Sequence, residues 1–400
     1  MNYEDFVSVL SGRDLPAALV DLDALDANTD LLVSHLERRD VTLRIATKSI
    51  RVPALLRHLL ERAGDRLVGL MTYSAKETAF LHQQGFDDFL LAYPVGRSGD
   101  ARAIAQLVAD GATVTTAVDC EEHIVLLGFA AREAGVELDL CLDVDMSWRP
   151  LQGRAHLGVR RSPIRTGDDA RRIAARVRAE KGVRLTAVLA YEAQIAGMQD
   201  HNAGSRQLDP LRRLIKRRSE PVATARRAEV VAALREAGCD IQLVNGGGTG
   251  SVRSTSRDPS VTEVTAGSGF LCPHLFDGYD DLPLQPAAFY AVAVTRRSDK
   301  GFVTCGGGGY IASGAAGVDR LPTVHLPTGL TALSMEGFGE VQTPFQTDPA
   351  APSLTVGDPV ICRHAKGGEL AERFTHYLLT RGAKVRESVP TYRGLGGCFL

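Results

Sequence analysis

The chain has 400 residues, of which 44% are hydrophobic and 24% charged, and its formal net charge is −2. This composition is ordinary for a globular enzyme, and the near-neutral charge gives no electrostatic reason to expect nucleic acid or a membrane as a partner. No apolar stretch has the length of a membrane span, and the first residues lack the apolar core of a signal peptide. Seven cysteines without C-x-x-C spacing argue against a disulfide framework and favour a cytoplasmic location.

Short β-rich runs alternate with helical patterns, such as residues 101–110 and 222–238, over the first two thirds of the chain. Eight such alternations predict an α/β fold with a (β/α)8 TIM-like barrel rather than an open sheet. The expected strands are Val41–Ala46, Leu67–Met71, Asp88–Ala92, Thr113–Val118, Glu137–Val144, Leu185–Ala190, Ile241–Val244 and Val261–Val264.

After about Leu275 the helical periodicity fades, and short β-like runs alternate with Gly and Pro turns. We therefore expect the barrel over residues 23–278 and a C-terminal all-β domain over residues 279–400. The early run AALVDL (17–22) lies outside the eight-strand count, so the N-terminal segment 1–22 is expected to pair with the β domain.

One lysine, Lys48, ends the first expected barrel strand in the sequence LRIATKSIR. A residue at that position points into the barrel mouth, where the active sites of (β/α)8 enzymes form. A lysine amine shielded from water is also what Schiff-base chemistry requires. Taken alone, Lys48 is more simply a surface lysine just beyond a strand.

Two glycine-rich loops change the interpretation of Lys48. VNGGGTGS (244–251) follows the seventh expected strand, and EVTAGSGF (263–270) follows the eighth. Glycines let the backbone approach a ligand closely, and the hydroxyls of Thr249, Ser251 and Ser268 suit a phosphate. Phosphate sites in barrels are often built from these two loops. Each loop alone is equally an ordinary turn, but together with Lys48 they can hold pyridoxal 5′-phosphate at both ends.

With these motifs the chain resembles the D-threonine aldolase / D-serine dehydratase branch of the alanine racemase-like (fold type III) pyridoxal-phosphate enzymes. The similarity covers nearly the whole chain. It runs through LPAALVDLDALDANTDLL (15–32), the Arg44-x-x-x-Lys48 motif, TYSAKETAFLHQQG (72–85), AYEAQIAG (190–197), the two glycine loops and the C-terminal domain.

The resemblance implies roles for individual residues. Lys48 matches the catalytic lysine that carries the cofactor, and Tyr191 and Gln194 fall in the segment that faces the cofactor ring. Tyr191 is alternatively a strand-end tyrosine that packs on the barrel rim. His156 and Arg160 lie near the family's D-x-G…R-x-G-V region, but the insertion SWRPLQGRA displaces them. The phosphate cradle matches Gly247, Gly248, Thr249, Gly267 and Ser268.

The chain departs from the family at the metal ligands. The enzymes it resembles bind a divalent ion through a His-x-Cys or His-x-Asp pair in the β domain, and the equivalent stretch here is RHAKGGEL (363–370). His364 matches the first ligand, but Lys366 stands at the second, and a protonated lysine repels a cation. Three alternatives stay open: no metal, with Lys366 as a catalytic residue that replaces its charge; a remodelled site that uses Glu369; or a different alignment. We favour the first alternative, and His364 is otherwise a buried, hydrogen-bonded histidine.

The sequence therefore predicts a lyase that acts on β-hydroxy-D-amino acids through a Lys48 Schiff base. Aldolase cleavage of the Cα–Cβ bond is favoured, because without a metal the expulsion of hydroxide suffers more than retro-aldol cleavage. The alternatives are a D-serine dehydratase or amino-acid deaminase, and a racemase with Tyr310 or Tyr392 as its second base. A non-catalytic cofactor carrier is disfavoured because such barrels lack a C-terminal β domain. By resemblance the protein is a homodimer in which one subunit's β domain closes the other's barrel mouth.

Overall fold

A computed structural model describes residues 1–297 and 301–399 of the chain. Its contacts divide the chain into two compact units. The first, here called the β unit, comprises Met1–Leu31, Ser49–His58 and Ser268–Cys398. The second, here called the barrel unit, comprises Leu32–Lys48 and Leu59–Gly267, with the last residues of the chain. Among the described residues, no helix has the length and apolar character that crossing a membrane requires.

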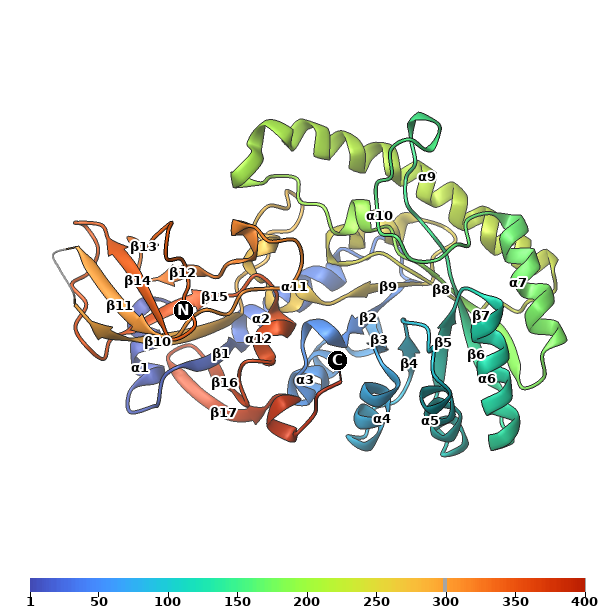
Figure 1. Ribbon diagram of the computed structural model, residues 1–400, viewed down its shortest axis with the longest axis horizontal. Coiled ribbons are helices and arrows are strands. Elements are labelled where there is room, and N and C mark those ends of the chain that lie inside the picture. The colour runs from blue at the N-terminus through green and yellow to red at the C-terminus, as the bar shows by residue number, and fades with distance from the viewer. Residues whose placement is uncertain (298–300, 400) are drawn as a thin grey trace. The chain divides into compact units, whose positions relative to one another are not determined.

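Eight parallel strands, β2 to β9, close into a barrel in the barrel unit (Figure 1). Each strand pairs with the next, and β2 pairs with β9 to complete the ring. The strands are β2 (Thr42–Ala46), β3 (Leu67–Thr72), β4 (Phe89–Leu91), β5 (Val114–Val118), β6 (Leu138–Asp143), β7 (Val183–Ala190), β8 (Leu243–Gly246) and β9 (Glu263–Ala266).

The predicted (β/α)8 barrel is confirmed, and each expected run overlaps one strand of the barrel. The last two strands begin two residues later than predicted. The reason is that the apolar runs start before the strand pairing does. Ile241 and Val261 are buried, at 6% and 0% exposure, but lie ahead of the paired residues.

The helices between and beside these strands begin and end at recognisable signals. Ser74 caps α4 by accepting a hydrogen bond from the N–H of Glu77, and Thr166 forms a capping box with Asp169 at the start of α7. The helices are α2 (Leu22–Ser34), α3 (Pro53–Ala63), α4 (Ala75–Gln83), α5 (Ser98–Ala109), α6 (Glu121–Ala134), α7 (Gly167–Ala179), α8 (Ala193–Ala196), α9 (Asp209–Glu236), α10 (Val252–Arg257) and α11 (Ser268–Leu271).

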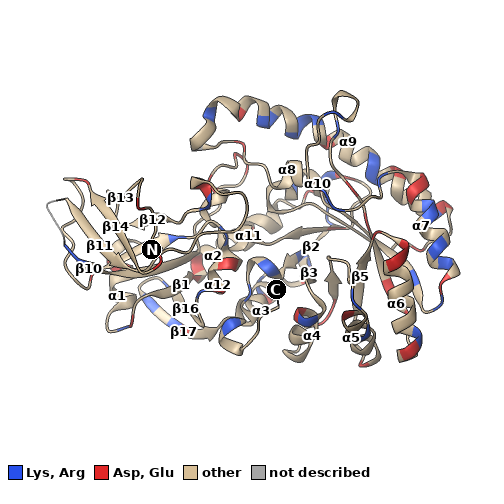
Figure 2. Ribbon diagram, in the orientation of Figure 1, with Lys and Arg blue, Asp and Glu red and all other residues tan. Residues whose placement is uncertain are grey.

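Helix α9 is longer than its sequence pattern indicates. The pattern predicts a helix over residues 222–238, whereas α9 starts at Asp209 and continues through Pro221. A proline inside a helix removes one backbone hydrogen bond and ordinarily ends or kinks the helix, so a start after Pro221 was the simpler prediction. Lys and Arg residues recur along α9 (Figure 2). One of them, Arg227, is only 2% exposed and lies among the charged partners described below.

The N-terminal ends of the barrel strands surround a buried arginine, Arg44 on β2. Its guanidinium donates to Glu263 Oε1 at 2.7 Å and to Asp88 Oδ1 at 2.9 Å. These carboxylates raise the pKa of Arg44 above its usual value, although burial works in the opposite direction. Gly69 has a φ of +59°, and a Cβ there would overlap Arg44 Nη1 and Asp88. The arginine of the Arg44-x-x-x-Lys48 motif therefore ties strands together inside the barrel.

The β unit is built on one mixed sheet with the order β13-β14-β11-β10-β1-β16-β17, and β15 pairs with both β10 and β12. The predicted C-terminal all-β architecture is confirmed. The strands are β1 (Ala17–Asp21), β10 (Ala288–Arg296), β11 (Phe302–Gly306), β12 (Thr323–Leu326), β13 (Leu330–Ala332), β14 (Gln342–Thr347), β15 (Pro359–Arg363), β16 (His376–Arg381) and β17 (Lys384–Pro390).

The N-terminal segment lies in the middle of this sheet. Strand β1 is antiparallel to β10 and parallel to β16. Before it, α1 (Tyr3–Leu10) buries Phe6 and Leu10 in one apolar cluster with Phe289 and Ile361. A further short helix of this unit, α12 (Gly367–Ala371), follows β15.

Candidate active site

Lys48 leaves the barrel directly after its first strand. Strand β2 ends at Ala46, and Lys48 lies in the short 3-10 turn Thr47–Ser49. Its Nζ donates a hydrogen bond to Tyr93 Oη at 2.9 Å and lies 5.5 Å from the centroid of the same ring. The side chain is exposed, so a small carbonyl compound can reach the amine from solvent.

Tyr93 and Arg161 join Lys48 in a cluster that the sequence did not predict. The Arg161 guanidinium lies over two aromatic rings, 5.6 Å from the centroid of Tyr93 and 5.3 Å from that of Tyr191. Burial raises the pKa of Tyr191 to about 12. The pKa of the Tyr93 phenol is below its usual value because the charges of Lys48 and Arg161 outweigh the opposing effect of burial. Tyr93 could have been found from its place two residues beyond β4, because barrel sites form at strand ends.

The resemblance placed His156 and Arg160 near the family's R-x-G-V region. His156 Nε2 is 3.2 Å from the carbonyl oxygen of Val159, and Arg160 is exposed. The residue over the two tyrosine rings is Arg161, one position further along the chain.

Asp143, the last residue of β6, is a second group that the sequence did not predict. Its side chain is buried, with 5% exposure. Burial raises the pKa of Asp143 to about 7; Arg161 opposes this shift, and Asp119 and Asp145 add to it. The charge of Asp143 also acts on the pKa of Tyr93. A carboxyl group with a pKa near neutrality can both accept and release a proton at physiological pH.

The glycine turn after β8 packs tightly on the chain itself. Gly247 has a φ of +69°, and its N–H donates to Glu192 Oε2 at 3.0 Å. A Cβ at Gly247 would lie 2.8 Å from Thr255 Oγ1, and one at Gly248 would lie 3.0 Å from Ala196 Cβ. Internal packing and a positive φ therefore already favour glycine at Gly247, and a Cβ at Gly248 would be tightly packed, so the glycines by themselves do not indicate a ligand.

A buried ionic network holds this turn in place. Glu192, which accepts the N–H of Gly247, also accepts hydrogen bonds from Thr255 Oγ1 and, at 3.0 Å, from Arg227 Nη2. Arg227 Nη1 pairs with Asp258. The three charged side chains are between 1% and 3% exposed. Two carboxylates thus share one positive charge, and one of them, Glu192, fixes the backbone of the turn.

A hydrogen bond joins the loops after β8 and β9. Thr249, which is 5% exposed, begins the 3-10 turn Thr249–Ser251, and its Oγ1 accepts a hydrogen bond from the N–H of Gly267 at 3.4 Å. The next residue, Ser268, belongs to the β unit, where its Oγ lies 3.2 Å from Ser49 Oγ. Ser49 in turn directly follows Lys48 in the sequence.

Gln194, in α8 after β7, is 3% exposed. Its Nε2 donates to the carbonyl oxygen of Met146 at 2.8 Å, whereas its buried Oε1 accepts no hydrogen bond within the described part of the chain. An unpaired buried oxygen costs free energy unless a donor reaches it, so this atom is suited to accept a hydrogen bond from a bound molecule.

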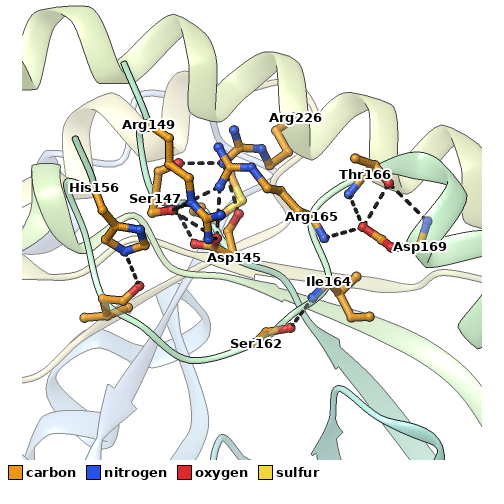
Figure 3. Close-up of polar contacts among 12 residues, drawn as sticks. Asp145, Ser147, Arg149, His156, Ser162, Ile164, Arg165, Thr166, Asp169 and Arg226 are labelled. Carbon is orange, nitrogen blue, oxygen red and sulfur yellow. Dashed lines mark hydrogen bonds and ion pairs between the residues drawn. The ribbon is translucent and has the colours of Figure 1, made fainter. Parts of the chain in front are cut away.

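The loop that Gln194 contacts is held by a cluster around Asp145 (Figure 3). Asp145 Oδ2 accepts hydrogen bonds from Ser147 Oγ at 3.0 Å, Arg149 Nη2 at 2.5 Å and Arg165 Nη1 at 2.9 Å. Arg226, from α9, donates to the backbone carbonyls of Asp145 and Ser147 at 3.0 and 2.9 Å. Burial, together with the charge of Arg165, lowers the pKa of Arg226 to about 10. These contacts fix the segment after β6, which includes Met146, whose carbonyl oxygen accepts the hydrogen bond from Gln194.

In the β unit the residues matched to the metal ligands form a hydrogen-bonded group. The Lys366 side chain is 37% exposed and that of Glu369 26%, while His364 is only 2% exposed. Lys366 Nζ donates to Ser313 Oγ at 2.8 Å and pairs with Glu369 Oε1 at 3.1 Å. Burial lowers the pKa of His364 to about 4.

One cluster of metal-ligating type is present among residues 1–297 and 301–399, and it lies elsewhere, after β5. It consists of Asp119, Cys120 and His123, whose ligand atoms lie within 4.8 Å of one another. His123 Nδ1 is 3.1 Å from Asp119 Oδ1, and burial raises the pKa of the Cys120 thiol. Because zinc binds the thiolate, a raised thiol pKa weakens the case for a metal at this group.

A closed (β/α)8 barrel with a lysine after its first strand, joined to a mainly antiparallel sheet, defines the alanine racemase-like class of folds. The chain belongs to the family described as alanine racemase, N-terminal domain, whose model matches residues 20–269.

Among curated proteins, the chain is 26% identical over 253 residues to a 3-hydroxy-D-aspartate aldolase of Paracoccus denitrificans (strain Pd 1222). The match covers 63% of this chain and 59% of that protein. It is also 26% identical over 267 residues to a D-threonine aldolase of Arthrobacter sp, covering 65% of this chain and 61% of the relative. The chain thus matches about three fifths of the length of these relatives.

Solved structures share the whole fold. The D-threonine aldolase from Filomicrobium marinum superposes with a TM-score of 0.77 at 22% identity and covers 95% of both chains. The D-threo-3-hydroxyaspartate dehydratase from Delftia sp. HT23 gives a TM-score of 0.75 at 18% identity, covering 96% of this chain and 98% of that one. The alanine racemase of Clostridium difficile 630 gives 0.63 at 14% identity, covering 94% and 98%. At these identities the likeness establishes the fold.

Proposed function

We propose that the protein is a pyridoxal-phosphate-dependent lyase that cleaves the Cα–Cβ bond of β-hydroxy-D-amino acids. The observation that carries the proposal is the position of Lys48, which follows the first barrel strand with its Nζ hydrogen-bonded to Tyr93. Family membership supports it, as do two relatives named as aldolases of D-threonine and 3-hydroxy-D-aspartate. Both of those compounds are β-hydroxy-D-amino acids.

The residues present fit the cofactor. Pyridoxal phosphate, when bound, supplies an aldehyde for a lysine amine and a ring that withdraws electrons from the bond to be broken. Lys48 would provide the amine, and the unpaired Oε1 of Gln194 would accept a hydrogen bond from the bound molecule beside Tyr191. The phosphate end would be held by Gly247, Gly248, Thr249 and Gly267 with the adjoining Ser268.

Three further residues of the barrel, Arg161, Tyr93 and Asp143, would bind the substrate or transfer protons. Arg161 is exposed and presents a planar guanidinium, which suits two-pronged binding of an amino-acid carboxylate. Tyr93 Oη, 2.9 Å from Lys48 Nζ, can exchange a proton with that nitrogen. Cleavage requires removal of the β-hydroxyl proton, and Asp143, with its pKa raised to about 7, is the acceptor that we assign to it.

Two other reactions remain as outcomes of the test. A dehydratase or deaminase would release a ketoacid and ammonia, and the dehydratase from Delftia shares the fold. A racemase would require a second base, for which Tyr310 and Tyr392 are the candidates. Burial raises the pKa of Tyr310, and Tyr392 is only 1% exposed, so both are poor proton acceptors near neutral pH.

We also propose a cytoplasmic homodimer. The resemblance supports the dimer, and Cys141, Cys272, Cys305 and Cys362 are buried thiols, as suits a reducing compartment. Gel filtration combined with light scattering tests the dimer, because a monomeric mass would contradict it.

The central test is the reconstitution of wild-type protein and Lys48→Ala with pyridoxal phosphate. After borohydride reduction, the wild-type peptide that contains Lys48 should carry the mass of the cofactor, and D-threonine should yield glycine and acetaldehyde. Lys48→Ala should lose both properties. Lys76→Ala, at an exposed lysine on α4, is the matched control. Turnover by Lys48→Ala at the wild-type rate would refute the proposal.

A product screen separates the three reactions. D- and L-β-hydroxy amino acids are incubated with and without a chelator, and the products are identified. An aldehyde with glycine supports the aldolase, whereas a ketoacid with ammonia or an inverted amino acid overturns it.

A further inference from the structure

We infer that the β unit carries a fixed ammonium ion, that of Lys366, where the enzymes that the chain resembles hold a divalent metal, and that this position binds no metal. The inference concerns a cluster of three side chains, those of Lys366, Glu369 and Ser313, which lie on or beside α12.

The first observation is that His364 is already occupied. Its Nδ1 lies 2.6 Å from the carbonyl oxygen and 2.9 Å from the backbone nitrogen of Lys366. A backbone group of Tyr310 also hydrogen-bonds to the ring. A histidine ligand must offer a nitrogen lone pair to the metal. Because backbone groups of both Lys366 and Tyr310 contact its ring, His364 is a buried structural histidine.

The second observation is that Lys366 is built into place. Its Nζ contacts Ser313 Oγ at 2.8 Å and Glu369 Oε1 at 3.1 Å. Glu369 in turn accepts hydrogen bonds from Ser313 through both the backbone N–H, at 2.7 Å, and the hydroxyl, at 2.5 Å. These contacts hold the ammonium at one point and leave Glu369 committed to Ser313 and Lys366. The carboxylate is therefore not free to become the second ligand of a remodelled metal site.

The third observation concerns the donor count. A lysine ammonium has three N–H donors, and the contacts to Ser313 and Glu369 use two of them. The Lys366 side chain is 37% exposed, so the third donor can reach an oxygen of a small molecule.

The test measures metal binding, which does not depend on turnover. Wild-type protein, Lys366→Cys and Lys366→Met are incubated with Zn²⁺ and separately with Mn²⁺, desalted, and analysed for metal content and thermal stability. Wild-type protein and Lys366→Met should retain no stoichiometric metal at this position. Lys366→Cys creates a His-x-Cys pair but leaves His364 held by the backbone, so it should also retain no stoichiometric zinc and show no increase in Tm that EDTA reverses.

Two further variants locate any metal that the wild-type protein retains. Metal lost in Cys120→Ser but kept in His364→Ala lies at the cluster after β5 and leaves the inference intact. Stoichiometric metal lost in His364→Ala but kept in Cys120→Ser overturns it. Stoichiometric zinc in folded Lys366→Cys also overturns it, because the backbone contacts would then not prevent His364 from acting as a ligand.

Discussion

Arg227 offers the sharpest test of how the glycine turn is held. Its guanidinium is the shared partner of Glu192 and Asp258, and all three side chains are at most 3% exposed. In Arg227→Met the side chain keeps an unbranched apolar stem but loses the guanidinium and its charge, so the change removes the electrostatic partner and retains the packing of the stem.

The magnitude follows from burial. An exposed ion pair contributes about 1 kcal/mol or less, because water solvates each partner when the other is removed. Here neither carboxylate is accessible, and removal of one partner from a buried pair costs about 3–5 kcal/mol. Because Glu192 also anchors Gly247, the variant should in addition bind pyridoxal phosphate more weakly.

Urea unfolding followed by fluorescence of Trp148, the single tryptophan of the chain, reports on the barrel unit. Arg227→Met should lose about 3–5 kcal/mol of unfolding free energy. Arg218→Met, at an exposed position on the same helix, should stay within about 0.5 kcal/mol of wild type. A loss below about 1 kcal/mol in Arg227→Met would refute the assignment of the network as a buried, mutually dependent set of charges.

Two further substitutions test other parts of the barrel. Because burial raises the pKa of Asp143 from 3.8 to about 7, the folded protein binds a proton between these pH values that the unfolded chain has released. Wild-type stability should therefore fall as pH rises through this window, and Asp143→Asn should be the more stable by up to about 4 kcal/mol at pH 8 but not at pH 4; parallel stability profiles in urea would contradict this. Gly69→Ala places a Cβ against Arg44 and Asp88 at a φ of +59° and should cost more than about 2 kcal/mol in thermal or urea unfolding. Gly85→Ala, with a φ of +85° and open space around it, should cost only about 1–2 kcal/mol, so equal losses would argue against the overlap.

The barrel could be predicted from sequence because its signal is local. Each parallel strand is a short apolar run between helical patterns. At β8 and β9 the paired residues begin two positions after the start of the apolar run, but the run itself still indicated a strand. Helix α1 and the first turns of α9 were missed. The first is a single short helix that is stabilised by packing on a sheet formed from distant segments, and the second continues through a proline.

The candidate site could be predicted only in part, because only some of its residues belong to a local sequence pattern. Lys48 and the glycine loops carry their signal in adjacent residues. Tyr93, Arg161 and Asp143 belong to the site only because the ends of β4 and β6 and the loop beyond β6 converge, which no local pattern reports. The roles of Tyr191, Gln194 and the cradle residues stay predictions until the cofactor experiment is done.

The central place of β1 in its sheet has a consequence for biosynthesis. Ala17 pairs with Ala291, and Val20 pairs with Leu379, so β1 leaves the ribosome long before its two partners, β10 and β16. The barrel strands between them can pair as they emerge, whereas β1 keeps two open edges until these partners have been made. Termination after β9 and before β10 would therefore release a chain that contains all eight barrel strands but leaves β1 as an unpaired strand prone to aggregation.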